Sequence, residues 1–514
     1  MVKCLVLAPN DNVGILLDSP GRIGEIAQTF GSLKSNLILK NVIFQGHKMA
    51  IKNIKVNTPV IKFGQIIGLS TKNIVSGEHV HIHNIRFSDK IKFSQNQLVK
   101  SKVDFSKKDN YLPTSFRGYL RKDGRAGTRN YVVVISTVNC SAVVVKEVAR
   151  HFKKISFSKF KIDGVVPITH NSGCAQKAGG FSDRLLNKTI AGWLYNPNVV
   201  GAVVVGLGCE DVSIKSIKSS LGLRSKLNKP LLESFNIQDV GGTKKAVDLG
   251  IKKVKKILSG LPDFNRVELP VSLLTVALNC GGSDAFSAIT ANPALGISGD
   301  ILVSYGGTVV LGETPECFGA EKLLSKRCVS EIDKNELKHI FSQWRNLTKK
   351  HDISMNDNLA SGNITGGIST ILEKSLGAIS KGGTTGIKQV VNYAEQIKNK
   401  GLIFMDTPGF DPVSVTGLVA GGCNLVAFTT GNGSVYGCSI APTIKIATNS
   451  KLYKNLRNDI DIDAGKSLTK SDLTEVGQEI YRFFIQVANG VRTCSEKQGF
   501  EIDGFVPWQL GETL

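Results

Sequence analysis

Three short, mainly apolar runs constrain the fold of this chain most strongly. They cover residues 131–135, 164–168 and 199–205, and helix-like stretches separate them, the first running from about Ser141 to Lys153. A strand that is apolar at almost every position must be covered on both faces, and a parallel sheet with helices on each side provides that cover. The sequence therefore predicts an α/β domain over residues 113–265.

A second α/β domain is expected over residues 266–514. It begins after the break "LSGLPDFNRVELP" with the apolar run 271–278, and two later runs, 401–405 and 424–430, have the same character. A chain of 514 residues exceeds the size at which one core keeps growing. Two α/β domains agree with that limit.

The first 90 residues differ from the rest. Short strand-like runs such as 36–44 alternate there with Gly, Asn and Asp turns, which predicts a small all-β domain over residues 1–90. Residues 91–112 are polar and rich in lysine and serine, as expected for a linker. The predicted architecture is therefore multidomain, all-β and then α/β.

Composition restricts the class of protein. No run of about 18 apolar residues suggests a membrane span, and no signal-peptide pattern opens the chain, so we expect a cytoplasmic protein without a membrane partner. Ten cysteines are too few for a disulfide scaffold and indicate reduced thiols. The formal charge of +22 raises nucleic acid as a partner, but the lysines are dispersed and accompany no nucleic-acid motif, which disfavours it.

The stretch "GEHVHIHN" places His79, His81 and His83 at every second position. On a strand these side chains share one face, about 7 Å apart at each step. Imidazole binds several divalent metals, and His47 can add a ligand from a neighbouring strand. The alternative is an edge strand with solvated histidines.

Three arginines recur at four-residue spacing in "RKDGRAGTRNY": Arg121, Arg125 and Arg129. Their planar guanidinium groups suit bidentate capture of a carboxylate. Pairing with acidic residues of the protein itself is an equally good interpretation.

Three cysteines lie in glycine-rich turns that follow strands: Cys174, Cys209 and Cys280. Ligands of open α/β sheets gather at the carboxyl ends of strands, so these turns are expected to converge. Converging thiolates could hold iron or an iron–sulfur cluster, as an alternative to the histidine site. Each cysteine taken alone is better explained as a small buried residue.

The same turns carry polar residues. His170 and Glu210 are candidate acid–base groups. The competing interpretation is that each side chain only makes hydrogen bonds within its own turn. Further candidates for binding substrate are Asn139, Ser283, Asp284, Asn292, Glu313 and Asn432.

Taken together, the longer motifs resemble the altronate dehydratase and galactarate dehydratase family. "GHKMAI", "VIKFGQIIG" and "GEHVHIHN" resemble its N-terminal SAF domain, which has a β-clip fold. "GLGCE", "CGGSDAFSAITANPALG", "GETPECFGAE", "EKSLGAISKGG" and "PGFDPVSVTG" resemble successive blocks of its catalytic portion. The resemblance covers nearly the whole chain.

The chain departs from the family pattern at a few positions. Where the family reads Asn-Pro-Ser-Pro-Gly-Asn-Lys, this chain has Leu359, Ser361 and Ile364, and Asn432 replaces an arginine. An asparagine offers no charge to a carboxylate. These changes indicate either a different sugar-acid preference or a weakened site.

The resemblance implies loss of water from a hexonic or hexaric acid (altronate, galactonate or galactarate) to give a 2-keto-3-deoxy sugar acid. It also implies a divalent metal, Fe²⁺ or Mn²⁺. Positive charge would stabilise the enolate-like intermediate, and a metal or an acid would assist the leaving hydroxyl. In this hypothesis Arg125 and Arg129 hold carboxylate, with Arg121 beside them, and His170 or Glu210 moves the proton. The partner is then a small anionic sugar acid, and a homodimer is compatible with the sequence.

Two rival functions stay open. Relatives of this family act as carbon–sulfur lyases on a sulfonated hydroxy acid such as sulfolactate, an elimination with a different leaving group. A non-catalytic protein that binds anionic ligands is the alternative from another class, favoured only if the departures have disabled the site.

Overall fold

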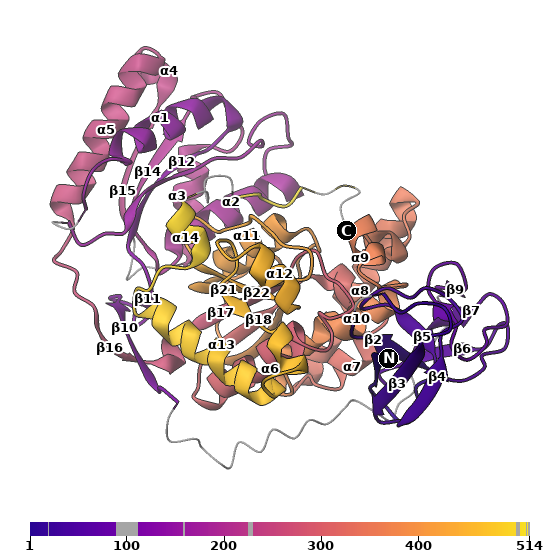
Figure 1. Ribbon diagram of the computed structural model, residues 1–514. Helices are drawn as coiled ribbons and strands as arrows, with labels where there is room; N and C mark the ends of the chain where they lie inside the picture. Colours follow the sequence, from indigo (N-terminus) through magenta and orange to yellow (C-terminus); the bar gives the residue numbers. More distant parts are fainter. Residues whose placement is uncertain are drawn as a thin grey trace.

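The computed structural model describes residues 1–18, 20–88, 112–157, 160–224, 230–499, 504–509 and 511. Within them the expected architecture is confirmed: an all-β region precedes two α/β regions with parallel sheets (Figure 1). The linker predicted over residues 91–112 lies outside the described residues, except for Leu112.

The N-terminal region is built from two small sheets. The larger has the order β4-β3-β1-β2-β5-β8, and the smaller has the order β6-β7-β9. Alternating burial along β1 shows the two-residue period of a strand with one covered face. The strands are β1 (Val2–Val6), β2 (Val13–Leu16), β3 (Ile26–Gly31), β4 (Ser35–Ile38), β5 (Lys48–Ala50), β6 (Pro59–Lys62), β7 (Gln65–Ser70), β8 (His79–Val80) and β9 (Ile85–Arg86).

The second region contains a four-stranded parallel sheet in the order β13-β12-β14-β15. Every residue of β12 and β14 is buried, as expected for strands covered on both faces. The strands are β12 (Tyr131–Ser136), β13 (Gly164–Ile168), β14 (Val199–Gly206) and β15 (Leu231–Asn236); the helices are α1 (Ala142–Phe152), α2 (Phe181–Tyr195), α3 (Ile214–Arg224), α4 (Ile237–Val240) and α5 (Thr243–Gly260).

The third region is organised around a seven-stranded parallel sheet in the order β19-β20-β18-β17-β21-β22-β23. Its strands are β17 (Thr275–Cys280), β18 (Thr308–Leu311), β19 (Ile387–Val391), β20 (Gly401–Met405), β21 (Leu425–Thr430), β22 (Thr443–Ala447) and β23 (Ile462–Asp463). Its helices are α6 (Ala291–Ser304), α7 (Glu321–Ser325), α8 (Glu331–His351), α9 (Ser361–Thr365), α10 (Ile371–Ile379), α11 (Asp411–Gly421), α12 (Ser450–Asn455), α13 (Leu473–Ala488) and α14 (Cys494–Gln498).

The two α/β regions share a packed layer. Helix α2 packs against α11, and one hydrophobic cluster includes residues of both sheets. The indole Nε1 of Trp193 donates to the carbonyl of Thr416 at 3.0 Å across this layer. A second connection is a three-stranded sheet of β11 (Ala126–Gly127), β10 (Ser115–Leu120) and β16 (Val267–Pro270). These contacts fix one sheet relative to the other.

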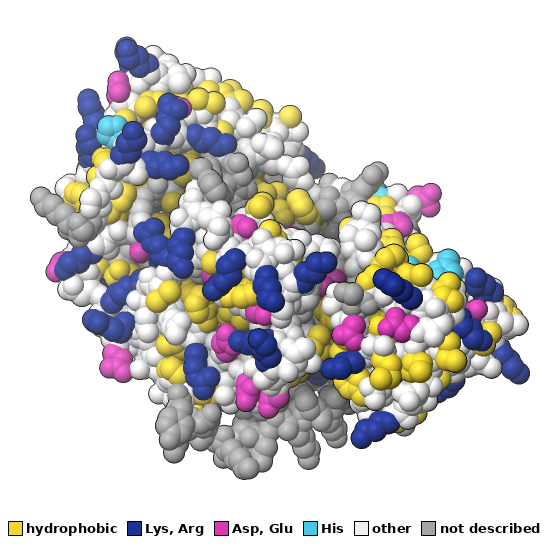
Figure 2. Space-filling model, in the orientation of Figure 1, with side chains coloured by type: hydrophobic (Ala, Val, Ile, Leu, Met, Phe, Trp, Pro, Cys, Tyr) yellow, Lys and Arg dark blue, Asp and Glu magenta, His cyan; other side chains and the backbone are white. Residues whose placement is uncertain are grey.

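The surface shows a dispersed positive charge. Lysine and arginine side chains are spread over all parts of the face seen in Figure 2 and do not gather in one band. Among the described residues, no helix has both the length and the apolar character required to cross a bilayer. Nucleic-acid binding has no support from this face.

Candidate functional site

The carboxyl end of the seven-stranded sheet collects buried polar residues. Cys280 ends β17, Glu313 follows β18, Asp406 follows β20 directly, and Thr430 ends β21. Parallel strands bring such residues to one edge, which is where α/β proteins bind ligands. The site is therefore expected at this edge.

Five side chains form a buried ionic cluster there: Cys280, Glu313, Glu316, Lys374 and Lys381. Lys381 pairs with Glu313 and lies 2.7 Å from the sulfur of Cys280, while Lys374 Nζ lies 2.8 Å from Glu316 Oε1. The Cys280 thiol donates to Glu316 Oε2 at 3.0 Å. Two acidic side chains and two lysines are thus in mutual contact, so no charge in this buried cluster lacks a polar partner.

Burial and neighbouring charges push the pKa values of these carboxyl groups apart. Burial raises the pKa of Glu313 to about 8. Burial also acts on Glu316, but Lys374 and Lys381 outweigh it and lower the pKa of Glu316. Asp411, at the start of α11, has its pKa raised to about 7, first by burial and then by the charge of Glu316. Separated pKa values of this kind are typical of paired general acids and bases.

The backbone around Glu313 is strained. Glu313 has φ = 62°, in the left-handed region that residues other than glycine seldom adopt. Its backbone N–H donates to the hydroxyl of Thr407 at 2.6 Å, which helps to hold this conformation. Such strain is often found at functional sites.

The histidines of the N-terminal region lie together against α9. His47 Nδ1 and His79 Nε2 are 3.0 Å apart, and the rings of His47 and His81 stack with centroids 4.8 Å apart. The ring of His83 lies 5.2 Å from that of His79. His47 Nε2 and His81 Nε2 each lie 3.0 Å from a backbone carbonyl, of Thr365 and Ile364 respectively.

These imidazoles are prepared to act as neutral ligands. Burial lowers the pKa of His79 to about 3 and that of His81 to about 4, and also lowers the pKa of His47. A carbonyl only accepts hydrogen bonds, so His47 Nε2 carries a proton and donates it to Thr365, and His47 Nδ1 accepts the hydrogen bond from His79 Nε2. Tetrahedral ligands about 2.0–2.1 Å from one ion lie about 3.3–3.4 Å apart. The 3.0 Å between His47 and His79 is the length of the hydrogen bond that joins the two rings.

Three potential ligand atoms within 4.8 Å of one another occur once among the described residues, in Cys280, Glu313 and Glu316. Lys381 already places its ammonium group beside two of these three side chains. A cation entering this group would have to displace that ammonium charge. Burial and then neighbouring charges, that of Lys48 among them, lower the pKa values of His79 and His81, but Lys48 pairs with Glu373 and not with an imidazole, so the histidines stay a second candidate metal site.

A second buried ion cluster joins the N-terminal region to the α/β region. Lys48 Nζ lies 2.9 Å and Lys62 Nζ lies 2.7 Å from the carboxylate of Glu373 in α10, and Lys48 also donates to the carbonyl of Gly367 at 2.7 Å. Lys48 follows His47, and Glu373 precedes Lys374. Through its adjacent residues Glu373 and Lys374, helix α10 therefore contacts both Lys48, next to His47, and Glu316 in the ionic cluster.

Several predicted substrate-binding residues lie beside this edge. A small pocket is lined by residues that include Ser283, Asp284, Asn292 and Lys62. Asp284 accepts a hydrogen bond from Thr448 at 3.0 Å. Asn432 is exposed, and its amide nitrogen would lie 2.9 Å from a Cβ added at Gly362, so it borders the segment that carries the departures from the family pattern.

His170, Glu210 and Asn139 lie on the other sheet, in turns that follow β13, β14 and β12. His170 Nε2 lies 3.1 Å from the carbonyl of Ser136, and its Nδ1 accepts from the N–H of Ser172 at 3.1 Å. Glu210 accepts from the hydroxyl of Thr137 at 2.6 Å and from two backbone N–H groups. Cys174 and Cys209 are in the same turns, apart from Cys280, which belongs to the seven-stranded sheet.

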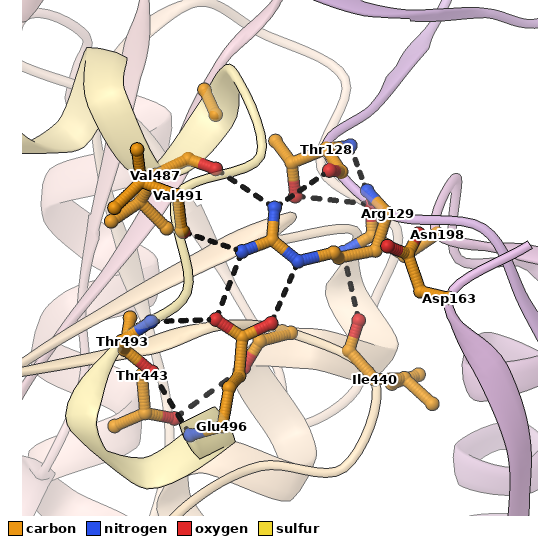
Figure 3. A network of polar contacts seen from close by, with 12 residues as sticks. Thr128, Arg129, Asp163, Asn198, Ile440, Thr443, Val487, Val491, Thr493 and Glu496 are labelled. Atoms are coloured by element: carbon orange, nitrogen blue, oxygen red, sulfur yellow. Dashed lines mark hydrogen bonds and ion pairs between the residues drawn. The ribbon is translucent and has the colours of Figure 1, made fainter.

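The three predicted arginines contact the protein itself. Arg129 forms a bidentate pair with Glu496 at 2.7 and 2.9 Å and donates to the carbonyls of Val487 and Val491 (Figure 3). Arg121 donates to the carbonyl of Pro197, and Arg125 pairs with Asp123 and stacks on Tyr195 at 3.6 Å. Carboxylate capture by these arginines stays a prediction.

The sequence reasoning did not assign Lys374 or Lys381 to the site, and it gave no role to Glu316 or Asp411, which stand in motifs that it singled out. A signal was present for two pairs. Glu313 and Glu316 are three residues apart in "GETPE", and Lys374 and Lys381 are seven apart in "EKSLGAISKGG", a spacing that returns to one helix face. Nothing in the sequence signalled that the two lysines pair with the two glutamates.

Comparison with known families matches three parts of the chain. Residues 2–88 match the altronate/galactarate dehydratase SAF domain, residues 118–261 the second domain of D-galactarate dehydratase/altronate hydrolase, and residues 271–513 the C-terminal domain of D-galactarate/altronate dehydratase. Each of the three described regions thus has a counterpart.

Named relatives match over most of their length. The chain is 34% identical to altronate dehydratase of Bacillus subtilis (strain 168) over 98% of both chains. It is 31% identical to galactarate dehydratase (L-threo-forming) of Escherichia coli (strain K12), over 95% of this chain and 93% of the relative. It is 30% identical to the (2R)-sulfolactate sulfo-lyase subunit beta of Chromohalobacter salexigens, over 75% of this chain and 95% of the relative.

Proposed function

Because the chain belongs to the altronate/galactarate dehydratase family, we propose that it is a hydro-lyase that removes water from a hexonic or hexaric acid. The product would be a 2-keto-3-deoxy sugar acid. The observation that carries the proposal is the buried pair Glu313 and Glu316, two carboxyl groups in contact with one thiol and held with separated pKa values.

The pKa values suggest the roles of the two carboxyl groups. Glu316 is ionised at neutral pH and accepts the proton from C2 of the substrate. Glu313 is largely protonated there and donates its proton to the C3 hydroxyl, which leaves as water. The resulting enol converts to the 2-keto acid. His170 and Glu210 stay candidates, but among the described residues their hydrogen bonds are with backbone groups and the hydroxyl of Thr137.

The two lysines supply positive charge where it is needed. Loss of the C2 proton leaves negative charge on the substrate carboxylate, and a fixed ammonium group in a buried site stabilises such charge strongly. Lys381, which is fully buried between Cys280 and Glu313, is placed to do this. Lys374 keeps Glu316 ionised.

A divalent metal, Fe²⁺ or Mn²⁺, is part of the proposal, and His47 and His79 would hold it together with His81 or His83. When bound it would supply positive charge to substrate oxygens. The N-terminal region then closes the site and brings these ligands to it, since His47 and His81 contact the carbonyls of Thr365 and Ile364.

The test is keto-acid formation from altronate, galactonate and galactarate by anaerobically purified protein with Fe²⁺ or Mn²⁺. We expect turnover of one of these acids, loss of turnover in Glu316→Gln, and retained turnover in the matched surface variant Glu331→Gln. Release of sulfite from sulfolactate without keto-acid formation from any sugar acid would support the lyase alternative. Binding without turnover of any of the acids would contradict both.

A further inference from the structure

Three exposed thiols lie at one edge of the four-stranded sheet, and all of them precede the proposed catalytic residues Glu313 and Glu316 in the sequence. Of the ten cysteines, Cys140, Cys174 and Cys209 are the exposed ones, whereas the other seven are buried or half-buried. They follow β12, β13 and β14, which are neighbours in the sheet and run parallel. The three thiols therefore come from adjacent turns at the carboxyl ends of adjacent strands.

Hydrogen bonds tie these turns to one another. The N–H of Asn139 donates to the carbonyl of Ser172 at 3.2 Å, and the N–H of Val212 donates to the carbonyl of Gly173 at 3.4 Å. The N–H of Gln176 donates to the carboxylate of Asp211 at 3.2 Å. Each contact lies within three residues of a cysteine on both sides, so the three turns that carry the thiols lie side by side.

The backbone of the turns has an uncommon conformation. Gly173 and Ala175, on either side of Cys174, have φ values of 104° and 57°, and Gly208 before Cys209 has φ = 125°. A Cβ at Gly173 would lie 2.3 Å from the carbonyl oxygen of Thr137, so the close approach of the two turns requires glycine. Left-handed residues in such turns form concavities of backbone N–H groups, which many iron–sulfur sites use.

We propose that Cys140, Cys174 and Cys209 bind an iron–sulfur cluster through three thiolates, with one iron left without a cysteine ligand. When a preformed cluster is transferred from a small thiol such as dithiothreitol, three Fe–S bonds to the donor thiolates break and three to the cysteines form, the three cysteine protons pass to the departing thiolates, and no electron is transferred. The cysteine set differs from the earlier expectation because Cys280 is buried in the other sheet, beside Glu313 and Glu316.

The spacing of the thiols favours a cluster over one metal ion. Three sulfurs bound to a single Zn²⁺ at about 2.3 Å lie about 3.8 Å apart. The sulfurs of Cys140, Cys174 and Cys209 do not all lie within 4.8 Å of one another, so at least one pair is further apart than that. In a cluster each thiolate binds a different iron, so the ligands stand further apart.

The cluster and the proposed dehydration are separate inferences. The thiols belong to the second region, and the ionic cluster of Glu313, Glu316 and Lys381 belongs to the third. Measurement of cluster content therefore tests this inference without reference to turnover.

The experiment is anaerobic reconstitution of the full-length protein with ferric iron, dithiothreitol and sulfide, followed by assay of iron, acid-labile sulfide and visible absorption. We expect about four iron and four sulfide per chain. Cys140→Ser, Cys174→Ser and Cys209→Ser should each lose most of the absorption and sulfide. Cys494→Ser, at a half-buried cysteine away from this edge, is the matched control and should retain both.

Alkylation of the wild-type protein needs no variant and covers the case in which a substitution impairs folding. Iodoacetamide should label Cys140, Cys174 and Cys209 in the unreconstituted protein and should spare all three after reconstitution. Metal uptake without sulfide, a cluster retained in the triple serine variant, or a cluster lost in Cys280→Ser but kept in Cys140→Ser would each overturn the proposal.

Discussion

Replacement of Glu373 by glutamine should release the N-terminal region from the α/β region. Glu373 is the one carboxylate that receives both Lys48 and Lys62, and all three side chains are at most 2% exposed. Removing one partner of a buried ion pair costs about 3–5 kcal/mol because a buried charge is left uncompensated. Here two ammonium groups lose their partner at once.

The molecule can avoid that cost by exposing the two lysines to water. The predicted change is therefore a shift of about 3–5 kcal/mol in the equilibrium between the docked and undocked N-terminal region, or roughly 10²- to 4 × 10³-fold. If docking is worth less than this, undocking is complete. Either way the histidines leave the carbonyls of Ile364 and Thr365, so activity and metal affinity should fall together.

Hydrogen–deuterium exchange is the assay. In Glu373→Gln, amides of residues 47–50 and 364–370 should exchange faster, while those of α13 should not change. Glu331→Gln, which breaks a surface pair with Lys334, is the control and should leave both sets unchanged. Replacing Lys48, Lys62 and Glu373 together by methionine should restore protection, since an apolar set leaves no buried charge. Unchanged exchange in Glu373→Gln would refute the docking role of this ion cluster.

Four further outcomes are expected. Lys381→Met should reduce kcat by at least about 10²-fold with little change in KM, because it removes charge that stabilises the transition state. A KM raised by the same factor with kcat unchanged would contradict that role. Asp411 has a pKa raised to about 7 from an ordinary value of 3.8, so its contribution to stability is greatest below about pH 4 and is lost as the pH rises to about 7. Chemical denaturation at several pH values should show that Asp411→Asn weakens the dependence of the unfolding free energy on pH. The same dependence in the variant and the wild-type protein would refute this prediction. His79→Ala should lower bound Fe²⁺ or Mn²⁺ by 10-fold or more without lowering the melting temperature, whereas exposed His151→Ala should not; equal metal content in both would contradict the histidine site. Arg129→Ala should destabilise the fold by about 3–5 kcal/mol because Glu496 stays buried and unpaired, and restoration of stability by adding Glu496→Ala would support this, whereas a neutral single variant would argue against it.

Much of the fold could be predicted from local patterns. The runs 131–135 and 199–205 are apolar at almost every position, and both form buried central strands. The helix expected from Ser141 to Lys153 is α1, Ala142–Phe152. Such features depend on residues close together in the chain, so periodicity and composition reveal them.

The site was only partly predictable. Glu313, Ser283, Asp284 and Asn292 were candidates from the sequence, and they lie at or beside the carboxyl end of the seven-stranded sheet, but their roles stay predictions. The histidines of "GEHVHIHN" were expected to share one face, and their rings lie close together. Lys381 was not assigned, because its contact with Glu313 joins residues 68 positions apart and leaves no local signal. The arginines show the opposite difficulty. Their spacing suggested a ligand site, but Arg129 pairs with Glu496, 367 residues later (Figure 3).

The sequence by itself determined the all-β and α/β regions, the residue types at the strand ends and the family, since each depends on local order along the chain. Only the tertiary structure decided which of those residues meet. It placed Lys381 between Cys280 and Glu313, Glu373 between Lys48 and Lys62, and Cys140 on the edge shared with Cys174 and Cys209. The physical reason is that a buried charge or thiol takes its partner from whatever the packing of distant elements brings within a few ångströms, which one-dimensional patterns do not encode.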